Sequence, residues 1–116
     1  MSDTETTTDM TVELVPLLRA LADPVRLHIF ATCVRDGTYV CVPERLGIDH
    51  RLESTLAHHV RLLRESGVVT ARADGPVVSL RVRRAHLESR FPGLTDALTN
   101  AADGADLLNS RLLKGN

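Results

Sequence analysis

Residues 54–69 read STLAHHVRLLRESGVV, and this stretch decides how the rest of the chain is interpreted. Its apolar side chains recur at helical spacing, at Leu56, Val60, Leu63 and Val68. The outward positions carry hydroxyl, imidazole and guanidinium groups, and Gly67 ends the helical pattern. The stretch therefore predicts a helix from about residue 52 or 54 to residue 66, with one face anchored in a core and a basic face outside.

The segments on both sides of this helix predict a helix-turn-helix followed by a hairpin. Before it, residues 43–46 predict a short helix that a proline opens and Gly47 closes, and residues 48–53 predict the turn. After it, β-rich runs at 68–73 and 77–82 flank the turn sequence Asp74-Gly75-Pro76. A short helix, a turn, a longer basic helix and a hairpin wing are the parts of a DNA-binding winged helix.

The first third of the chain predicts two helices behind an acidic tail. Residues 1–9 are polar and acidic, and we expect them to be disordered. A helix is expected from about residue 11 to residue 21, with a broad apolar stripe and an interior proline as its weak point. Asp23-Pro24 begins a second helix to about Val34, because aspartate caps free N–H groups and proline suits the first turn. Its buried side is expected at Leu27, Phe30, Ala31 and Val34. Residues 38–42 follow as a short strand.

The last third predicts a short helix at 84–90, a break at 91–93 and a helix from 94 to about 113. The last helix carries an apolar stripe at Leu94, Ala97, Leu98, Ala101, Leu108 and Leu112. With no core left to cover, that stripe is expected to pair with a second copy of the chain, as is the stripe of the first helix. The predicted fold class is mainly α with a small β-hairpin. It is a winged helix-turn-helix with N- and C-terminal dimerisation helices, in a single domain over residues 10–116.

Composition and charge limit the kinds of molecule that the protein is expected to bind. Aromatic residues are only 3% of the chain, which argues against stacking platforms for single-stranded nucleic acid. The formal net charge is −1, yet eight arginines face four acidic residues between His50 and Arg90. Basic charge is therefore concentrated around residues 54–66, as binding of duplex phosphates requires. Two cysteines, no signal peptide and no long apolar run predict a soluble, cytoplasmic protein without membrane contact.

The candidates for contact with DNA lie on the basic helix and on the wing. They are Ser54, Thr55, His58, His59, Arg61 and Arg64 on the helix, and Arg72, Gly75 and Arg81 on the wing. Hydroxyl groups at a helix N-terminus suit phosphates or base edges. We expect Thr55 and His58 to read bases in the major groove, and Arg61 and Arg64 to hold phosphates.

Alternatives stay open for several of these candidates. His59 adjoins the apolar row, so a packing role competes with base contact. Arg72 and Arg81 suit the minor groove or the DNA backbone, but they also suit an ordinary solvated strand. Gly75 permits a tight wing tip.

The chain resembles the arsenic-repressor-like (ArsR) family of winged-helix regulators. LLRALADPVRLHIF at 17–30 resembles the opening signature of that family, and residues 54–69 resemble its recognition helix. ADG at 73–75 sits at the family's wing tip, and LRVRRAHLESRFPGL at 80–94 is similar to a tail found in one branch. The resemblance covers about residues 17–98. It implies a homodimeric repressor that binds a palindromic operator in double-stranded DNA.

Two positions depart from the family pattern. Ala57 stands where the family usually has serine, so one contact to DNA is missing. The metal-binding branches often carry Cys-Val-Cys, whereas Cys41-Val42 is followed by Pro43 here. That removes one sulfur ligand from the arsenic-type site.

The sequence gives weaker indications of a sensing site or of catalysis. Cys33 and Cys41 are the candidates for a thiol or metal sensor, against the commoner role of cysteine as a small buried hydrophobe. No spaced set of ligands predicts a metal site, so no cofactor is expected. No glycine loop for phosphate, carboxylate pair or activated nucleophile indicates an enzyme.

The function predicted from the sequence is therefore a dimeric, sequence-specific DNA-binding repressor of the ArsR type. Its inducer is left open between a small molecule and a metal ion. The alternatives are a winged-helix module that binds a protein and not DNA, and a thiol- or metal-responsive variant that uses Cys33 and Cys41.

Overall fold

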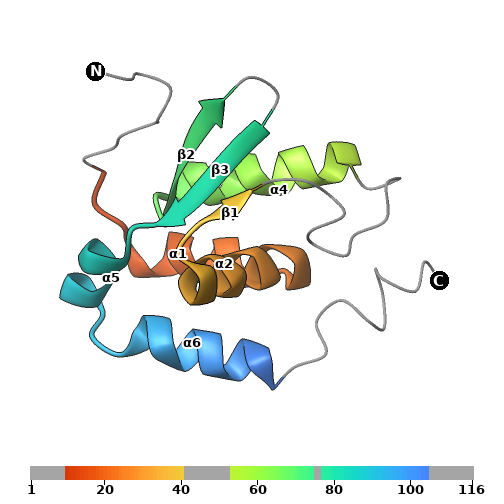
Figure 1. The fold of residues 1–116 in the computed structure, drawn as a ribbon. Helices are drawn as coiled ribbons and strands as arrows, with labels where there is room; N and C mark the ends of the chain where they lie inside the picture. Colours follow the sequence, from red (N-terminus) through yellow and green to blue (C-terminus); the bar gives the residue numbers. More distant parts are fainter. Residues whose placement is uncertain (1–9, 41–52, 75–76, 105–116) are drawn as a thin grey trace.

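The computed structural model describes residues 10–40, 53–74 and 77–104. The elements within these ranges are α1 (Leu14–Leu21), α2 (Pro24–Asp36), β1 (Tyr39–Val40), α4 (Glu53–Ser66), β2 (Val69–Asp74), β3 (Val77–Val82), α5 (Arg84–Arg90) and α6 (Leu94–Asp103). Figure 1 shows the sheet above α2, with α4 behind the hairpin and α6 at the bottom. None of the helices in these ranges is long and apolar enough to cross a membrane.

Several predicted features lie outside the described residues. They are the acidic tail at 1–9, the short helix at 43–46 with the turn that follows it, the wing tip at 75–76 and the last helix beyond 104. The first helix of the predicted helix-turn-helix is among them.

The predicted hairpin is confirmed, and its register separates two faces of the sheet. The strand order is β1-β3-β2, and both pairings are antiparallel. Ala71 pairs with Leu80, and both are buried on the face that packs against the helices. Thr70 pairs with Arg81 on the opposite face, because side chains alternate along a strand.

Helix α1 begins at Leu14, three residues later than the pattern predicted. Pro16 therefore stands in the first turn, where its missing N–H leaves no hydrogen bond unmade. Ahead of it Val12 is extended and fully buried. Its N–H donates to Nε2 of His86 (3.1 Å), and its carbonyl accepts from Nε of Arg90 (2.7 Å). This segment is thus held by α5 and not by helical hydrogen bonds.

Helix α2 occupies the centre of the domain. The Asp23 carboxylate caps it as predicted, accepting from the backbone N–H groups of Val25 (2.9 Å) and Arg26 (3.1 Å). Phe30 and Ala31 are buried as expected, but the predicted Leu27 and Val34 are only half-buried. Val25, Ile29 and Cys33 are buried in addition. Leu27 and Val34 still pack against the core, and the buried surface of α2 is wider than the predicted stripe because α1, α4, α6 and the sheet all contact this helix.

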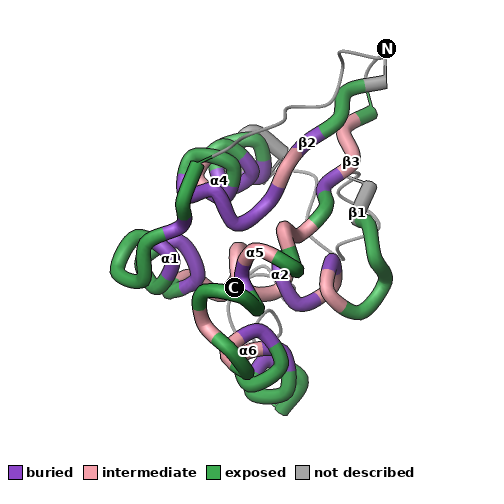
Figure 2. Tube along the Cα trace, turned by 90° about the vertical axis from the view of Figure 1, so that its left-hand side faces the viewer, coloured by how far each residue is buried: buried purple, intermediate pink, exposed green. Residues whose placement is uncertain are grey.

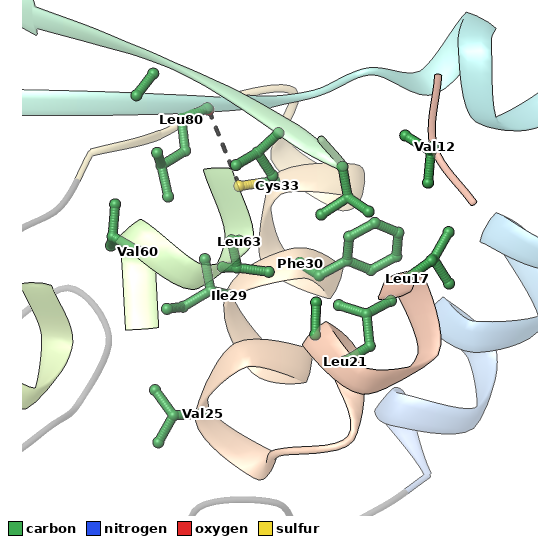
Figure 3. Packing of buried hydrophobic residues seen from close by; sticks show 14 of the residues in the cluster. Val12, Leu17, Leu21, Val25, Ile29, Phe30, Cys33, Val60, Leu63 and Leu80 are labelled. Atoms are coloured by element: carbon green, nitrogen blue, oxygen red, sulfur yellow. Dashed lines mark hydrogen bonds between the residues drawn. The ribbon is translucent and has the colours of Figure 1, made fainter. Parts of the chain in front are cut away.

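Among the described residues the core is almost entirely aliphatic, and it surrounds the buried ring of Phe30. Figure 3 shows Phe30 of α2 between side chains of α1, α4 and the sheet. The largest fully buried side chains are those of Phe30, Leu17, Ile29, Leu63, Leu80, Leu87, Val12, Val68, Val69 and Cys33. The side of α4 that faces this core is buried and the outward side is exposed (Figure 2).

Helix α6 packs against α2 and α5, so the expectation that it had no core left to cover was wrong. Its buried face is Thr95, Thr99 and Ala102, whereas Ala97 and Ala101 of the predicted stripe are exposed. The hydroxyl of Thr99 donates to the carbonyl of Thr95 (2.8 Å), which satisfies that polar group inside the helix. The two threonines can therefore pack their methyl groups inward, which a count of apolar residues does not reveal.

Candidate nucleic-acid interface

Helix α4 has the amphipathic form that its sequence predicted. Leu56, Val60 and Leu63 are buried in the core, and Leu63 has no exposed surface. The exposed residues on its outer face are Ala57, His58, Arg61, Arg64 and Glu65. Ser54 and Thr55 lie in the first turn of α4, but their side chains lie outside the described part of the structure. The buried side of α4 thus anchors the helix in the core, and its basic side faces solvent.

Gly67 fixes the angle between α4 and the wing. Its φ is +86°, and a Cβ there would lie 3.2 Å from both Sδ of Met10 and Cγ2 of Val12. Nη1 of Arg83 donates to the carbonyls of Gly67 (3.0 Å) and Met10 (2.7 Å). Arg83 therefore ties the end of the helix, the base of the wing and the N-terminal segment together.

His58 and Arg61 contact each other on the exposed face of α4. Nη2 of Arg61 lies 3.1 Å from Nδ1 of His58. Because a guanidinium only donates, Nδ1 must accept, and the neutral imidazole then carries its proton on Nε2. An Nε2–H group can donate to an acceptor on a base edge in the major groove. The pair thus offers one oriented donor beside a permanent positive charge.

His59 points the other way, into the domain. Only 8% of the residue is exposed, and its Nδ1 lies 3.0 Å from Nη1 of Arg26 and 3.7 Å from Oδ2 of Asp23. Nε of Arg26 donates to the carbonyl of Ala20 (2.6 Å), which fixes the guanidinium. His59 therefore fastens α4 to the capped end of α2. These contacts match the packing alternative given for His59.

The buried position of His59 makes the free energy of unfolding depend on pH. Burial lowers the pKa of His59 below its ordinary 6.5; the carboxylate of Asp23 opposes this shift, and the charges of Arg26 and His58 add to it. The folded protein then binds fewer protons than the unfolded chain. The stability that neutral His59 contributes is complete above pH 6.5 and is lost as the pH falls through the lowered value.

We expect the free energy of unfolding to fall between pH 7.5 and 5.5, and to fall less steeply in His59→Gln. Urea denaturation at fixed pH steps measures both slopes. The pKa of His28 is also lowered, mainly by burial and then by the charge of Arg35. The effect of His28 on the pH dependence of stability is the same in the wild type and in His59→Gln. Equal slopes in the two proteins would show that His59 is not the titrating group.

Two groups of arginines in the described ranges differ in what they contact. Those engaged inside the domain are Arg26, Arg35, Arg83, Arg84 and Arg90. Three of these form ion pairs, Arg35 with Asp103, Arg84 with Asp96 and Arg90 with Glu13. By contrast, Arg61, Arg72 and Arg81 have no carboxylate partner among the side chains that the structure describes. Within that part of the chain, arginines that no carboxylate neutralises therefore lie on α4 and on both strands of the wing.

A groove separates α4 from the hairpin. It has a volume of about 330 Å³ and is lined by Leu56, Ala57, Val60, Arg61, Arg64 and Val78. The short side chain of Ala57 leaves this groove open where a larger residue would narrow it. On the far face of the sheet, Arg72 and Arg81 are exposed. Gly75 of the predicted wing contacts lies outside the described residues.

Cys33 is packed as a core residue. It is 1% exposed, and its Sγ lies 3.9 Å from the carbonyl oxygen of Leu80 (Figure 3). A reactive thiol needs access to solvent, so this burial favours the structural role. The other sensor candidate, Cys41, lies outside the described residues. Within those residues, no three His, Cys, Asp or Glu side chains gather as metal ligands.

The described helices and the hairpin that follows α4 are consistent with a winged helix-turn-helix. No protein-family model matches the chain. Over 59 residues, 51% of its length, the chain is 30% identical to an uncharacterised HTH-type transcriptional regulator of Methanocaldococcus jannaschii. The matched part is 65% of that relative, so the chain spans somewhat less than two thirds of its length. The similarity supports a helix-turn-helix protein.

Proposed function

We propose that the protein is a transcriptional regulator that binds duplex DNA through the exposed face of α4. The observation that carries this proposal is the arrangement of α4, whose inner face is buried while His58, Arg61 and Arg64 face solvent. A hairpin follows directly, as in a winged helix. The similarity to a helix-turn-helix regulator supports the same class.

The finer proposal is a homodimeric repressor of the ArsR type, acting in the cytoplasm. Leu14, Val15 and Leu18 on α1 remain 45%, 55% and 43% exposed, and Met10 beside them is 41% exposed. A cluster of large apolar side chains at the surface is typical of an interface between subunits. Two copies of α4 would then enter successive major grooves about 34 Å apart on a palindromic operator.

We expect the double variant Val15→Glu, Leu18→Glu to be a folded monomer. Both side chains are exposed in one subunit, so two glutamates cost little there but place unpaired charge in a dimer contact. Sedimentation velocity measures the mass, and circular dichroism checks the fold. The matched control Ala85→Glu, Ser89→Glu adds the same charge on exposed positions of α5. A monomeric wild type, or a variant that stays dimeric, would contradict the proposed interface.

Capture of genomic fragments tests the regulator itself. Fragments retained by the full chain should share an inverted repeat whose half-sites lie about one helical turn apart. Retained fragments without a shared motif would contradict sequence-specific binding. An inducer releases the operator only if it binds more tightly to a dimer whose α4 spacing no longer fits DNA. Genes beside the captured fragments would indicate its chemical class.

A further inference from the structure

The outer face of the sheet holds a polar hollow on the side away from the core. It has a volume of about 300 Å³ and is lined by Thr38, Thr70, Arg72, Ser79 and Arg81. The register explains the grouping, because Thr70 pairs with Arg81 and Arg72 with Ser79. The two arginines are therefore diagonal neighbours on adjacent strands, roughly 7–8 Å apart, close enough for their guanidinium groups to contact one ligand.

The donors of this hollow match a phosphate group. Arg72 and Arg81 carry permanent positive charge, and neither has a carboxylate partner among the side chains that the structure describes, which do not include that of Asp74. The hydroxyl groups of Thr38 and Ser79 add further donors. A carboxylate presents only two oxygens, whereas a phosphate presents three or four acceptors to paired guanidinium groups. The volume exceeds that of a bare phosphate ion and reaches the lower end of ordinary small-molecule sites.

This hollow is separate from the surface proposed to read DNA. Ala71 and Leu80, on the opposite face of the same strands, belong to the core that also holds Leu63 of α4. The sheet therefore stands between the hollow and the buried side of the recognition helix. We propose that the hollow binds the phosphate group of a small phosphorylated molecule through Arg72 and Arg81. Binding there does not depend on the proposed function.

A titration with inorganic pyrophosphate tests the site without DNA. Amide resonances of the full-length chain are followed by NMR at constant ionic strength kept with sodium chloride. We expect saturable shifts at residues 38, 70, 72, 79 and 81. The variant Arg72→Gln, Arg81→Gln should bind at least about tenfold more weakly, because each lost charge-assisted hydrogen bond is worth roughly a factor of ten.

The matched control is Arg35→Gln, Arg84→Gln, which removes the same charge from arginines on other elements. It should bind pyrophosphate as the wild type does. Shifts that do not saturate, or equal binding by the two variants, would overturn the proposal. A duplex that shifts residues 72 and 81 when pyrophosphate does not would also overturn it, because the arginines would then hold the DNA backbone.

Discussion

Replacing His58 and Arg61 together by alanine is expected to weaken specific duplex binding by about 30-fold or more per subunit. The loss combines one oriented base-edge donor, worth roughly 1–3 kcal/mol, with one phosphate contact. Both side chains are exposed and contact each other through Nη2 and Nδ1, so their removal leaves the core intact. Fluorescence anisotropy on a fragment from the protein's own regulatory region measures the affinity.

The control for this variant is Arg35→Ala, which removes one positive charge from an arginine paired with Asp103 on α6. The duplex affinity of Arg35→Ala should stay within about threefold of the wild type, since Arg35 is paired with Asp103 and is not part of α4. Unfolding curves should show that both variants remain folded. Unchanged specific binding by His58→Ala, Arg61→Ala would exclude α4 as the base-reading helix.

The second large effect concerns the anchor of α4. Leu63 has no exposed surface and belongs to the core cluster that includes α2 and the sheet. Truncation to alanine leaves a cavity, so we expect Leu63→Ala to lower the free energy of unfolding by about 2–5 kcal/mol. For a domain of this size that is a large share of total stability, typically 5–15 kcal/mol.

Leu62 supplies the matched control because it is the same residue one position earlier in the same helix. It is half-buried, so Leu62→Ala should cost less than about 1.5 kcal/mol. Urea denaturation followed by circular dichroism measures both variants under the same conditions. A loss below about 1 kcal/mol for Leu63→Ala would contradict the packing that holds α4.

Elements marked by local signals could be predicted from the sequence. Asp23 caps α2, Gly67 ends α4 at a positive φ, and the β-rich runs after α4 pair as two antiparallel strands, as the residues indicated. Each of these signals acts through atoms within a few residues of itself. The basic face of α4 was predictable for a similar reason, because helical periodicity alone puts His58 and Arg61 on the side opposite Leu63.

Contacts between distant segments could not be predicted in the same way. The sequence does not show that His59 contacts Asp23 and Arg26, because both lie more than 30 positions earlier in the chain. The sequence feature that indicates packing of His59 is its position beside the apolar row of α4. Arg83 is one basic residue among several in the sequence, yet it donates to the carbonyls of Gly67 and Met10. Basic composition does not distinguish an arginine that ties the fold from one that faces solvent.

The same reason explains the error over the last helix. Threonines counted as polar positions, but Thr95 and Thr99 form the buried face of α6 once the hydroxyl of Thr99 is bonded within the helix. Among the described residues, the large apolar side chains that remain exposed include Leu14, Val15 and Leu18 of α1. Within those residues, the proposed dimer contact therefore rests mainly on the first helix.

The salt dependence of duplex binding tests the central claim most directly. If Arg61 and Arg64 of two subunits neutralise about four phosphates, log affinity should fall linearly with log salt, with a slope of about −3.6 or steeper. Titrations of a regulatory-region duplex from about 50 to 300 mM salt give this slope. No measurable duplex binding at the lowest salt would contradict the account and would favour a basic face that binds an acidic protein.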